Sequence, residues 1–184
     1  MKIISKVLSC IFGYLCLGLS ILVCVEVIGR KVFSVSLQGA DELGGYVLAV
    51  GSCLAFCVAL IGRNHMRIDI FHYRLPGKIQ AILNWVAIVT LALFGLLLAT
   101  TGFGIIRDTF SYHSTAPTPW ATPLIYPQGF WYAGLFMFAV IGVILAFRAT
   151  KLLLKNRLKE LQSEFQPKAA AEELEEELEN AARR

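Results

Sequence analysis

Four long stretches of this sequence contain no Asp, Glu, Lys or Arg, and they limit the fold more than any other feature. The stretches cover residues 7–25, 43–62, 79–106 and 109–147, and residues 128–147 alone are long enough to cross a bilayer. A hydrocarbon core about 30 Å thick needs about 20 apolar residues in a helix. The chain is 57% hydrophobic and 16% charged, whereas a typical soluble domain is about 25% charged. We therefore exclude a soluble globular protein, an exported soluble protein and a protein with a single membrane anchor.

The continuous apolar character of these stretches predicts helices rather than the alternating strands of a membrane barrel. We predict an all-α integral membrane protein with four transmembrane helices, over residues 7–29, 43–62, 79–106 and 128–147. Residues 1–150 would form one transmembrane domain, and residues 151–184 a charged cytoplasmic tail. The first helix is longer than the core of a signal peptide and ends in charged residues, so we expect it to stay uncleaved.

The positions of the basic residues predict the orientation of the chain. Cytoplasmic loops of membrane proteins carry an excess of Lys and Arg. With both termini and the loop between the second and third spans in the cytoplasm, eleven of the fourteen Lys and Arg residues nearest the spans face that side. We therefore expect both termini to be cytoplasmic. The net charge of +4 reflects this basic rim together with an acidic tail, and it does not indicate a nucleic-acid partner.

The loop of residues 63–78 is too short and too charged to span a membrane. Its apolar side chains interleave with polar and charged ones, among them Arg63, His65, Arg67 and Asp69. Such a segment is expected at the membrane interface, with its basic side towards lipid phosphates. The strict alternation over residues 65–70 also permits an extended conformation, and periodicity leaves the two open.

The loop of residues 107–127 contains four prolines and several aromatic residues. Proline lacks an N–H donor and fixes φ, so a long helix is excluded within this loop. We predict a compact external loop at the level of the lipid headgroups. Trp120 and Tyr126, with Trp131 at the start of the fourth span, would anchor this edge as aromatic residues do in interfacial belts.

The C-terminal tail is expected to begin as a cytoplasmic continuation of the fourth helix over residues 151–165. Leu154, Leu158, Leu161 and Phe165 would form one apolar stripe along it. Pro167 would end this helix, and an acidic segment of high helix propensity would follow over residues 169–182. The acidic segment is interpreted either as a solvated helix or as a small coiled-coil contact with a partner.

Few side chains in the predicted spans could do chemistry. Glu26 is the one charged residue expected at membrane depth, and we predict an ion pair with Arg30, four residues later on the same helix face. All three histidines fall in loops, which argues against a haem held by axial histidines from two helices. The five cysteines are interpreted as small apolar packing residues. We therefore expect no catalytic, cofactor or metal site on this chain.

The middle of the chain carries an ordered set of short motifs. Arg30 is followed by Glu42 before the second span, and His65 and Asp69 follow that span with three residues between them. The pair Leu75-Pro76 comes next, and a loop with Pro117, Trp120 and Pro123 leads into the fourth span. In this order, over about residues 7–154, the chain resembles the small membrane subunit (DctQ-like) of tripartite ATP-independent periplasmic (TRAP) transporters. It departs from that family at residues 38–40 and in the second span, where a Trp is common.

The resemblance implies a non-catalytic subunit of a transporter in the cytoplasmic (inner) membrane of a bacterium or archaeon. In this family a periplasmic binding protein captures an organic acid, and a large polytopic subunit moves it across the membrane with Na⁺ by an elevator motion. The small subunit packs against the static part of the large one. The implied partners are the large subunit, the binding protein and membrane phospholipids, with no nucleic acid. Na⁺ would bind to the large subunit, and this chain would hold no cofactor.

The resemblance also suggests roles for single residues. The loop between the second and third spans would be held at the cytoplasmic interface, against the large subunit or lipid headgroups, by Arg63, His65, Arg67 and Asp69. Arg30 and Glu42 would organise the outer face. The outer edge, beside a docked binding protein, would be anchored by Trp120, Tyr126 and Trp131. A stand-alone structural protein with four spans and the membrane anchor of a redox complex remain the alternative interpretations.

Overall fold

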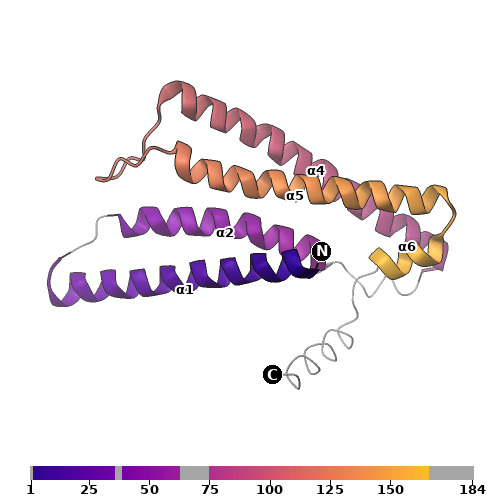
Figure 1. Cartoon of the computed structure of the whole chain (residues 1–184), viewed down its shortest axis with the longest axis horizontal. Coiled ribbons are helices and arrows are strands. Elements are labelled where there is room, and N and C mark those ends of the chain that lie inside the picture. Colours follow the sequence, from indigo (N-terminus) through magenta and orange to yellow (C-terminus); the bar gives the residue numbers. More distant parts are fainter. Residues whose placement is uncertain (1, 36–38, 63–74, 166–184) are drawn as a thin grey trace, which may run out of the picture.

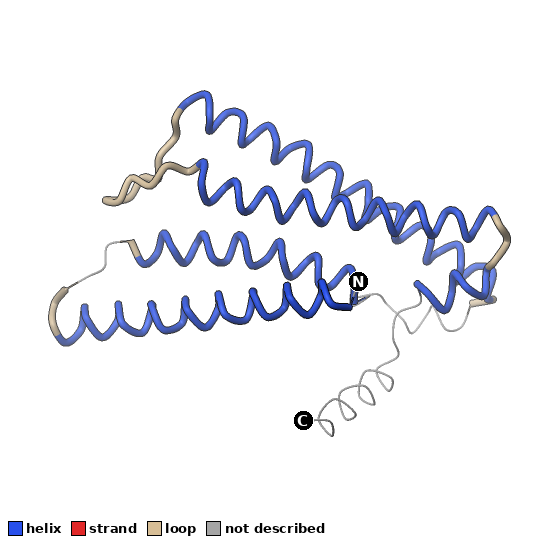
Figure 2. Tube along the Cα trace, viewed as in Figure 1, coloured by secondary structure: helices blue, strands red, loops and turns tan. Residues whose placement is uncertain are grey.

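The computed structural model describes residues 2–35, 39–62 and 75–165. These residues form the helices α1 (Lys2–Val32), α2 (Ala40–Gly62), α4 (Gly77–Tyr112), α5 (Ile125–Leu154) and α6 (Leu158–Phe165). The connecting segments that the structure describes are loops and turns (Figure 2). The helices α1, α2, α4 and α5 are each long and apolar enough to cross a membrane. The predicted all-α fold with four transmembrane helices is therefore confirmed.

The long helices are arranged as two pairs, α1 with α2 and α4 with α5 (Figure 1). The C-terminal end of α1, the start of α2 and the loop from α4 to α5 lie at the same end of the bundle, which we call the Trp120 end (Figure 1). The N-terminus and α6 lie towards the opposite end, which we call the α6 end (Figure 1). The two ends of the bundle therefore differ, because one carries the loop from α4 to α5 and the other carries α6.

The spans extend beyond the uncharged stretches from which they were predicted. Helix α4 has 36 residues, which at 1.5 Å per residue makes it about 54 Å long, well beyond the thickness of a hydrocarbon core. Helix α5 begins at Ile125 rather than near residue 128. Pro127 then lies in the first turn of α5, where a missing N–H is tolerated because that donor would have no partner within the helix.

Small residues set the contact between α4 and α5. A side chain added at Gly95 would meet the Ala139 Cα atom at 3.2 Å, and one added at Gly142 would meet the Ala92 Cα atom at 3.2 Å. Ala81 and Ala149, near the α6 end, are both fully buried. In a membrane, small side chains let helix backbones approach closely and gain dispersion contacts that lipid would otherwise supply. The α4–α5 pair is therefore closely packed along much of its length.

A smaller contact joins α2 to α5. The Cys53 Cβ atom lies so close to Gly134 that a side chain there would meet it at 2.7 Å, and the Cys57 thiol donates to the Gly134 carbonyl at 3.6 Å. Both cysteines are buried, which confirms them as packing residues, whereas Cys10 and Cys24 are exposed on α1. Helix α1 contacts α2, where the Phe12 ring covers Gly51.

The predicted continuous helix over residues 151–165 is wrong. Helix α5 ends at Leu154, and the chain turns through Asn156, whose φ is +55°. Helix α6 then packs back on α4 and α5, with Leu161 and Phe165 buried in a cluster with Ala81, Ile88 and Ala149. Leu154, expected on the same stripe, is exposed. The stripe is real only from Leu158 onward, because burying it against α4 and α5 requires the helix to break.

Polar contacts hold α6 in this position. The Gln162 side chain donates to the Gly77 carbonyl at 2.7 Å, at the start of α4. The Arg148 Nε and Glu164 Oε1 atoms form an ion pair of 2.7 Å between α5 and α6. The α6 end is therefore closed by both apolar and polar contacts. The tail beyond Phe165, including the predicted acidic helix, lies outside the described residues.

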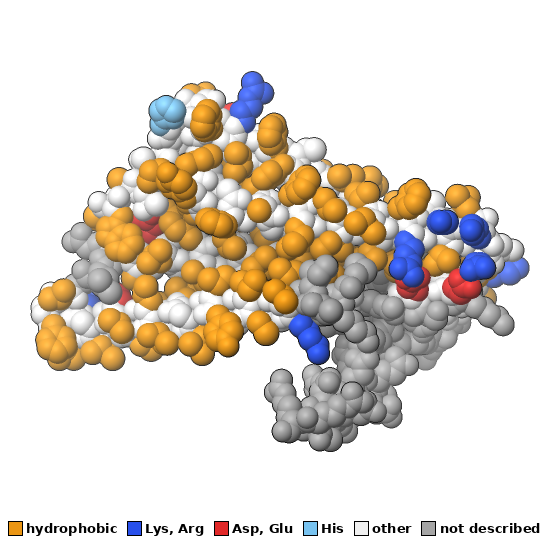
Figure 3. Space-filling view, viewed as in Figure 1, with side chains coloured by type: hydrophobic (Ala, Val, Ile, Leu, Met, Phe, Trp, Pro, Cys, Tyr) orange, Lys and Arg blue, Asp and Glu red, His pale blue; other side chains and the backbone are white. Residues whose placement is uncertain are grey.

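The surface of the long helices is largely apolar (Figure 3). Helix α1 is the extreme case, because only 6% of its most apolar 18-residue segment is buried within the fold. Large side chains such as Leu17, Ile21 and Val25 are more than half exposed along α1. Exposure of this extent in water would be prohibitive, so the surroundings of these helices are lipid or another membrane protein.

Candidate functional site

The candidate site lies at the Trp120 end, outside the packed interfaces between the helices. The loop from α4 to α5 folds there as a small hairpin. The Ala116 N–H donates to the Thr122 carbonyl at 2.9 Å, and the Leu124 N–H donates to the Ser114 carbonyl at 3.0 Å. Thr115 and Pro123 form an isolated antiparallel bridge. This geometry confirms the predicted compact loop and excludes a long helix between Tyr112 and Ile125.

Backbone hydrogen bonds define where this hairpin begins and where it turns. Helix α4 ends at His113, which adopts a left-handed conformation and donates its N–H to the Thr109 carbonyl. At the tip of the hairpin the Ala121 N–H donates to the Thr118 carbonyl at 2.9 Å, which closes a turn across the residues around Trp120. The prolines of the loop lack donors, so the pairing uses the N–H groups of other residues, Ala116 and Leu124.

Glu42 connects this hairpin to α2. It lies in the first turn of α2, where a carboxylate also complements the helix dipole. The Thr118 hydroxyl donates to Glu42 Oε2, and the Tyr46 hydroxyl donates to Glu42 Oε1 at 2.7 Å. Thr122 also lies within hydrogen-bonding reach of the carboxylate. Glu42 is buried, and a buried carboxylate needs such donors because it has lost its water. We call Glu42, Tyr46, Thr118 and Thr122 the Glu42 junction.

A second contact lies beside the Glu42 junction. Gly39 precedes α2, and a side chain at this position would collide with the ring of Trp120. The backbone of α2 therefore starts directly against the indole face, with Ala40 buried next to it. Half of the Trp120 side chain remains exposed. The hairpin thus both covers the start of α2 and presents an aromatic surface at this end of the bundle.

The hydrogen bonds of the Glu42 junction can hold α2 against the hairpin. One carboxylate accepts hydrogen bonds from hydroxyl groups on two chain segments, and its hydrogen-bonding Tyr46 lies four residues along the same helix. Within residues 2–35, 39–62 and 75–165, no group of three or more His, Cys, Asp or Glu residues could hold a metal ion. The arrangement can fix the position of α2 relative to the α4–α5 pair.

The structure brings only part of the predicted site residues together. Glu42 and Trp120 lie in the Glu42 junction and beside it. Arg30 is exposed in the last turn of α1, and Tyr126 is exposed at the start of α5. Trp131 lines a cavity of about 270 Å³ together with Tyr46 and Pro127. The roles suggested for these residues remain predictions.

Two groups of predicted contacts stay predictions. The first involves Arg63, His65, Arg67 and Asp69, which lie outside the described residues. Glu26 is buried near the end of α1. Two ion pairs in the described part of the chain, Arg148–Glu164 and Arg157–Glu160, both lie at the α6 end. The proposed Glu26–Arg30 pair therefore also stays a prediction.

Sequence reasoning missed the partners of Glu42. The spacing of Glu42 and Tyr46 by four residues is a signal for a contact along one helix, and it could have been read. The contact of Glu42 with Thr118 joins residues 76 positions apart and has no local signal. The same holds for the contact of Gln162 with Gly77 at the α6 end.

Comparison with known proteins supports a single assignment. A family model described as "Tripartite ATP-independent periplasmic transporters, DctQ component" matches residues 19–152. The match covers the second half of α1 from residue 19, all of α2 and α4, and nearly all of α5. A comparison with curated proteins gives no match. Because the family model matches well over half of the chain, the chain belongs to the DctQ family, the small membrane subunits of TRAP transporters.

Proposed function

We propose that this chain is a non-catalytic subunit that scaffolds the large membrane subunit of a Na⁺-coupled TRAP transporter for an organic acid. The observation that carries the proposal is the family match over residues 19–152, which includes the second half of the first span and nearly all of the other three. Membership makes the chain a multi-pass protein of the inner membrane. Association with a large membrane subunit and a periplasmic binding protein follows from that membership.

A scaffold needs a rigid frame and a lateral surface for its partner. The close packing of α4 against α5 through Gly95 and Gly142 supplies a frame. The exposed apolar side chains of α1 and of the outer faces of α4 supply lateral surface in the membrane. We assign the substrate and Na⁺ sites to the large subunit, and no cofactor to this chain. This division of labour suits spans whose buried residues are mainly Ala, Gly, Leu and Phe.

The charge distribution supports an orientation with the α6 end in the cytoplasm. The described part of the α6 end includes Lys78 at the start of α4, and Arg148, Lys151, Lys155 and Arg157 around the end of α5. Arg30, Lys31 and Arg107 belong to the Trp120 end. Cytoplasmic segments beside spans carry the excess of positive charge. The Trp120 end would then face the periplasm, with both termini in the cytoplasm.

In this orientation the Trp120 end would lie on the side of the binding protein. Trp120 and Tyr126 are exposed there, and aromatic side chains are enriched both at membrane interfaces and at protein contacts. The hairpin of residues 113–124 would act as an outer anchor beside the docked binding protein. On the cytoplasmic side, Arg63, His65, Arg67 and Asp69 would hold their loop against the large subunit or against lipid headgroups.

Co-purification tests this function. The tagged chain is expressed together with the genes next to its own, solubilised in a mild detergent and isolated. A large polytopic membrane protein is expected to co-purify, and it should remain when the tag is moved from one terminus to the other. A chain that purifies alone would support the stand-alone structural protein instead. A haem absorption band in the purified material would support the redox anchor.

The loop proposal has its own test. Asp69→Ala should reduce co-purification of the large subunit and uptake, because it removes a charge proposed to hold the loop at the interface. Asp108→Ala, at the opposite end of the bundle, is the matched control. If Asp69→Ala leaves both assembly and uptake intact, the loop does not have this role.

A further inference from the structure

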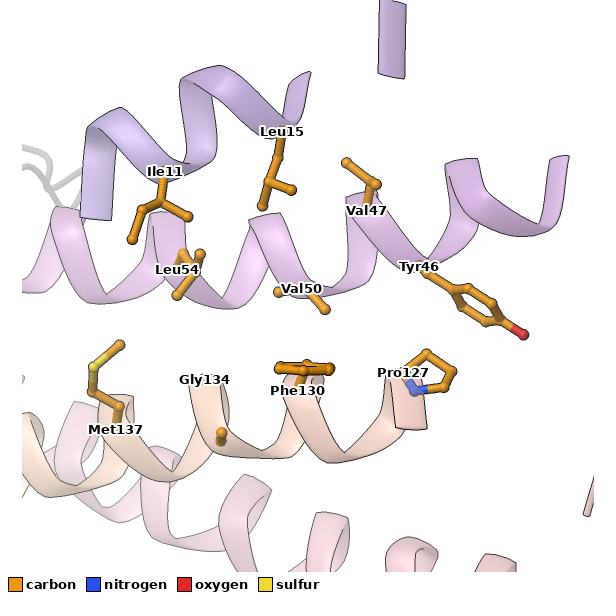
Figure 4. Close-up of a pocket in the computed structure, with 11 residues that line it drawn as sticks. Ile11, Leu15, Tyr46, Val47, Val50, Leu54, Pro127, Phe130, Gly134 and Met137 are labelled. Atoms are coloured by element: carbon orange, nitrogen blue, oxygen red, sulfur yellow. The ribbon is translucent and has the colours of Figure 1, made fainter. Parts of the chain in front are cut away.

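An open groove of about 530 Å³ runs between α1, α2 and α5 in the half of the bundle next to the Trp120 end (Figure 4). Ile11 and Leu15 line it from α1, while Val47, Val50 and Leu54 line it from α2. On the α5 side its lining residues are Pro127, Phe130, Ala133, Gly134 and Met137. Figure 4 shows the side chains of α2 and α5 facing each other across the space.

Helix α2 is fastened to the α4–α5 pair at two points beside the groove. Near the middle of the span, Cys53 packs directly on Gly134, and at the Trp120 end Glu42 accepts the hydrogen bond of Thr118. Gly134 itself lines the groove, which continues past it to Leu54 and Met137. Helix α1 stays against α2, because Phe12 covers Gly51, and the three helices leave a groove that their own side chains do not fill.

The length of the groove matches one leaflet of a bilayer. From Tyr46 to Leu54 the helix rises about 12 Å, and from Pro127 to Met137 it rises about 15 Å, at 1.5 Å per residue. One leaflet contributes half of a hydrocarbon core about 30 Å thick, which is about 15 Å. The groove therefore reaches from near the Trp120 end to about the middle of the membrane.

The walls of the groove offer almost nothing to a polar ligand. Tyr46 carries the only hydroxyl group among the lining side chains, and this hydroxyl already donates to Glu42 at 2.7 Å. In Figure 4 the Tyr46 hydroxyl points away from the other lining residues. Cavities lined by apolar atoms do not hold water well. The occupant should therefore be a hydrocarbon.

The width of the groove favours a thin hydrocarbon chain over a helix of another protein. Helix α2 contacts both α1 and α5, and helices in contact lie about 8–10 Å apart. A gap among helices at this spacing is narrower than a further helix, which is about 10–12 Å across with its side chains. An extended acyl chain needs much less width than a helix, and the leaflet that surrounds these spans supplies it without any recognition of a headgroup.

We propose that this groove holds one acyl chain of a phospholipid, which fills the space between α2 and α5 as part of the folded protein. The bound chain supplies the contacts that α1, α2 and α5 do not make with one another along the groove, and it supports the α1–α2 pair against α5. The site is independent of the transport function proposed above. Only the identity of the leaflet depends on the proposed orientation, in which the lipid belongs to the periplasmic leaflet.

Photolabelling tests the proposal. The full chain, together with any large subunit that co-purifies, is reconstituted in vesicles of phosphatidylethanolamine and phosphatidylglycerol. A small fraction of the phosphatidylethanolamine carries a diazirine in its acyl chain, and labelled peptides are identified by mass spectrometry. Val50→Trp fills the groove from α2. Val140→Trp is the matched control, because Val140 is an exposed valine on α5 that does not line the groove.

The expected result is labelling of groove residues that Val50→Trp largely removes and Val140→Trp leaves unchanged. Labelling of the exposed α1 face, for example at Val25, should be the same in all three proteins. Equal labelling of the groove in the Val50→Trp variant would overturn the proposal. So would labelling of the groove no stronger than that of Val25.

A second measurement does not depend on a filled groove. A benzophenone amino acid replaces Leu54, at the deep end of the groove, and the complex is irradiated in the same vesicles. Attachment of a phospholipid, seen as a mass increase of the chain, supports the proposal. Attachment of the large subunit or of a second copy of the chain would show that a protein fills the groove, and the proposal would fail.

Discussion

The contacts of α5 with α4 and with α2 are built from the same kind of residue but differ in extent. Against α4, small residues recur along the helix, with Gly95 on Ala139 and Gly142 on Ala92. Against α2, a single close approach at Gly134 is followed by an open groove. Helices in lipid gain little from burying apolar surface, because lipid tails are equally apolar. Where small residues repeat along a helix, the two helix backbones stay in contact. Where a small residue occurs once, the helices leave a space that a lipid chain or another side chain fills.

This difference divides the molecule into a frame and an attached pair. The α4–α5 pair, closed by α6 at one end, is the frame. The α1–α2 pair is attached through Cys53 and through the Glu42 junction. For a subunit that supports a larger one, the frame supplies rigidity, and the attached pair supplies an exposed apolar face. The predictions below test the two contacts in order of expected effect.

The largest effect is expected in the α4–α5 contact. Gly95→Leu forces a branched side chain against the Ala139 backbone, where even a Cβ atom would lie at 3.2 Å from the Cα atom. Overpacking of this kind costs about 1–3 kcal/mol or more. Gly104→Leu is the control, because nothing lies within 4 Å of a Cβ atom there. Thermal unfolding in detergent should show a large destabilisation for Gly95→Leu and little change for Gly104→Leu. Equal effects would contradict the close packing of the frame.

The α2–α5 contact should be the next most sensitive. Gly134→Ala places a Cβ atom 2.7 Å from that of Cys53, so the helices must move apart at a cost of about 1–3 kcal/mol. Adding Cys53→Gly removes the opposing atom and should restore part of the stability. Gly129→Ala, with open space around it, is the control. Spin-label distances between α2 and α5 should lengthen only in the single Gly134→Ala variant. A double variant less stable than the single one would refute this contact.

A smaller effect is expected at the Glu42 junction. Thr118→Val removes the hydroxyl that donates to Glu42 and keeps the shape of the side chain. Thr115→Val, an exposed position on the same hairpin, is the control. In a double-mutant cycle with Glu42→Leu, which has no hydrogen-bond acceptor in its side chain, the two changes should be non-additive, because each removes the same interaction. Additive losses of stability would mean that the hydrogen bond does not fasten α2 to the hairpin.

The smallest effect is expected at the ion pair that links α6 to the frame. The side chains of Arg148 and Glu164 are 60% and 25% exposed, and exposed ion pairs contribute about 0–1 kcal/mol. Arg148→Ala should therefore change the unfolding temperature slightly, and less in high salt. Leu161→Ala, which opens a cavity at a fully buried position, should make α6 far more sensitive to limited proteolysis. If Arg148→Ala has the greater effect of the two, polar contacts rather than burial hold α6.

The sequence was sufficient for the number of spans and the helical class, because uncharged stretches of span length have one interpretation in lipid. It also indicated the compact loop, through the prolines between Pro117 and Pro127, and the packing role of Cys53 and Cys57. It did not show that the helix breaks at Asn156. The stripe from Leu154 to Phe165 fits a straight helix equally well, and only the buried surface of α4 and α5 decides between the two.

The candidate site was predicted less well than the fold. Glu42 and Trp120 were selected from the sequence, but their partners Thr118 and Gly39 come from segments far away in the chain. Such contacts depend on how the helix pairs are placed, which no local pattern encodes. The groove is a stronger example, because it results from what α2 and α5 fail to contact. The loop with His65 and Asp69 keeps its predicted role without a structural test.

The central claim is that this chain supports transport carried out by other subunits, and Na⁺-driven uptake tests it most directly. Vesicles are prepared with the large subunit and the binding protein, with or without this chain, and uptake of labelled organic acids is measured under an inward Na⁺ gradient. We predict uptake that requires the binding protein and is lost or strongly reduced without this chain. Undiminished uptake in its absence would contradict the claim.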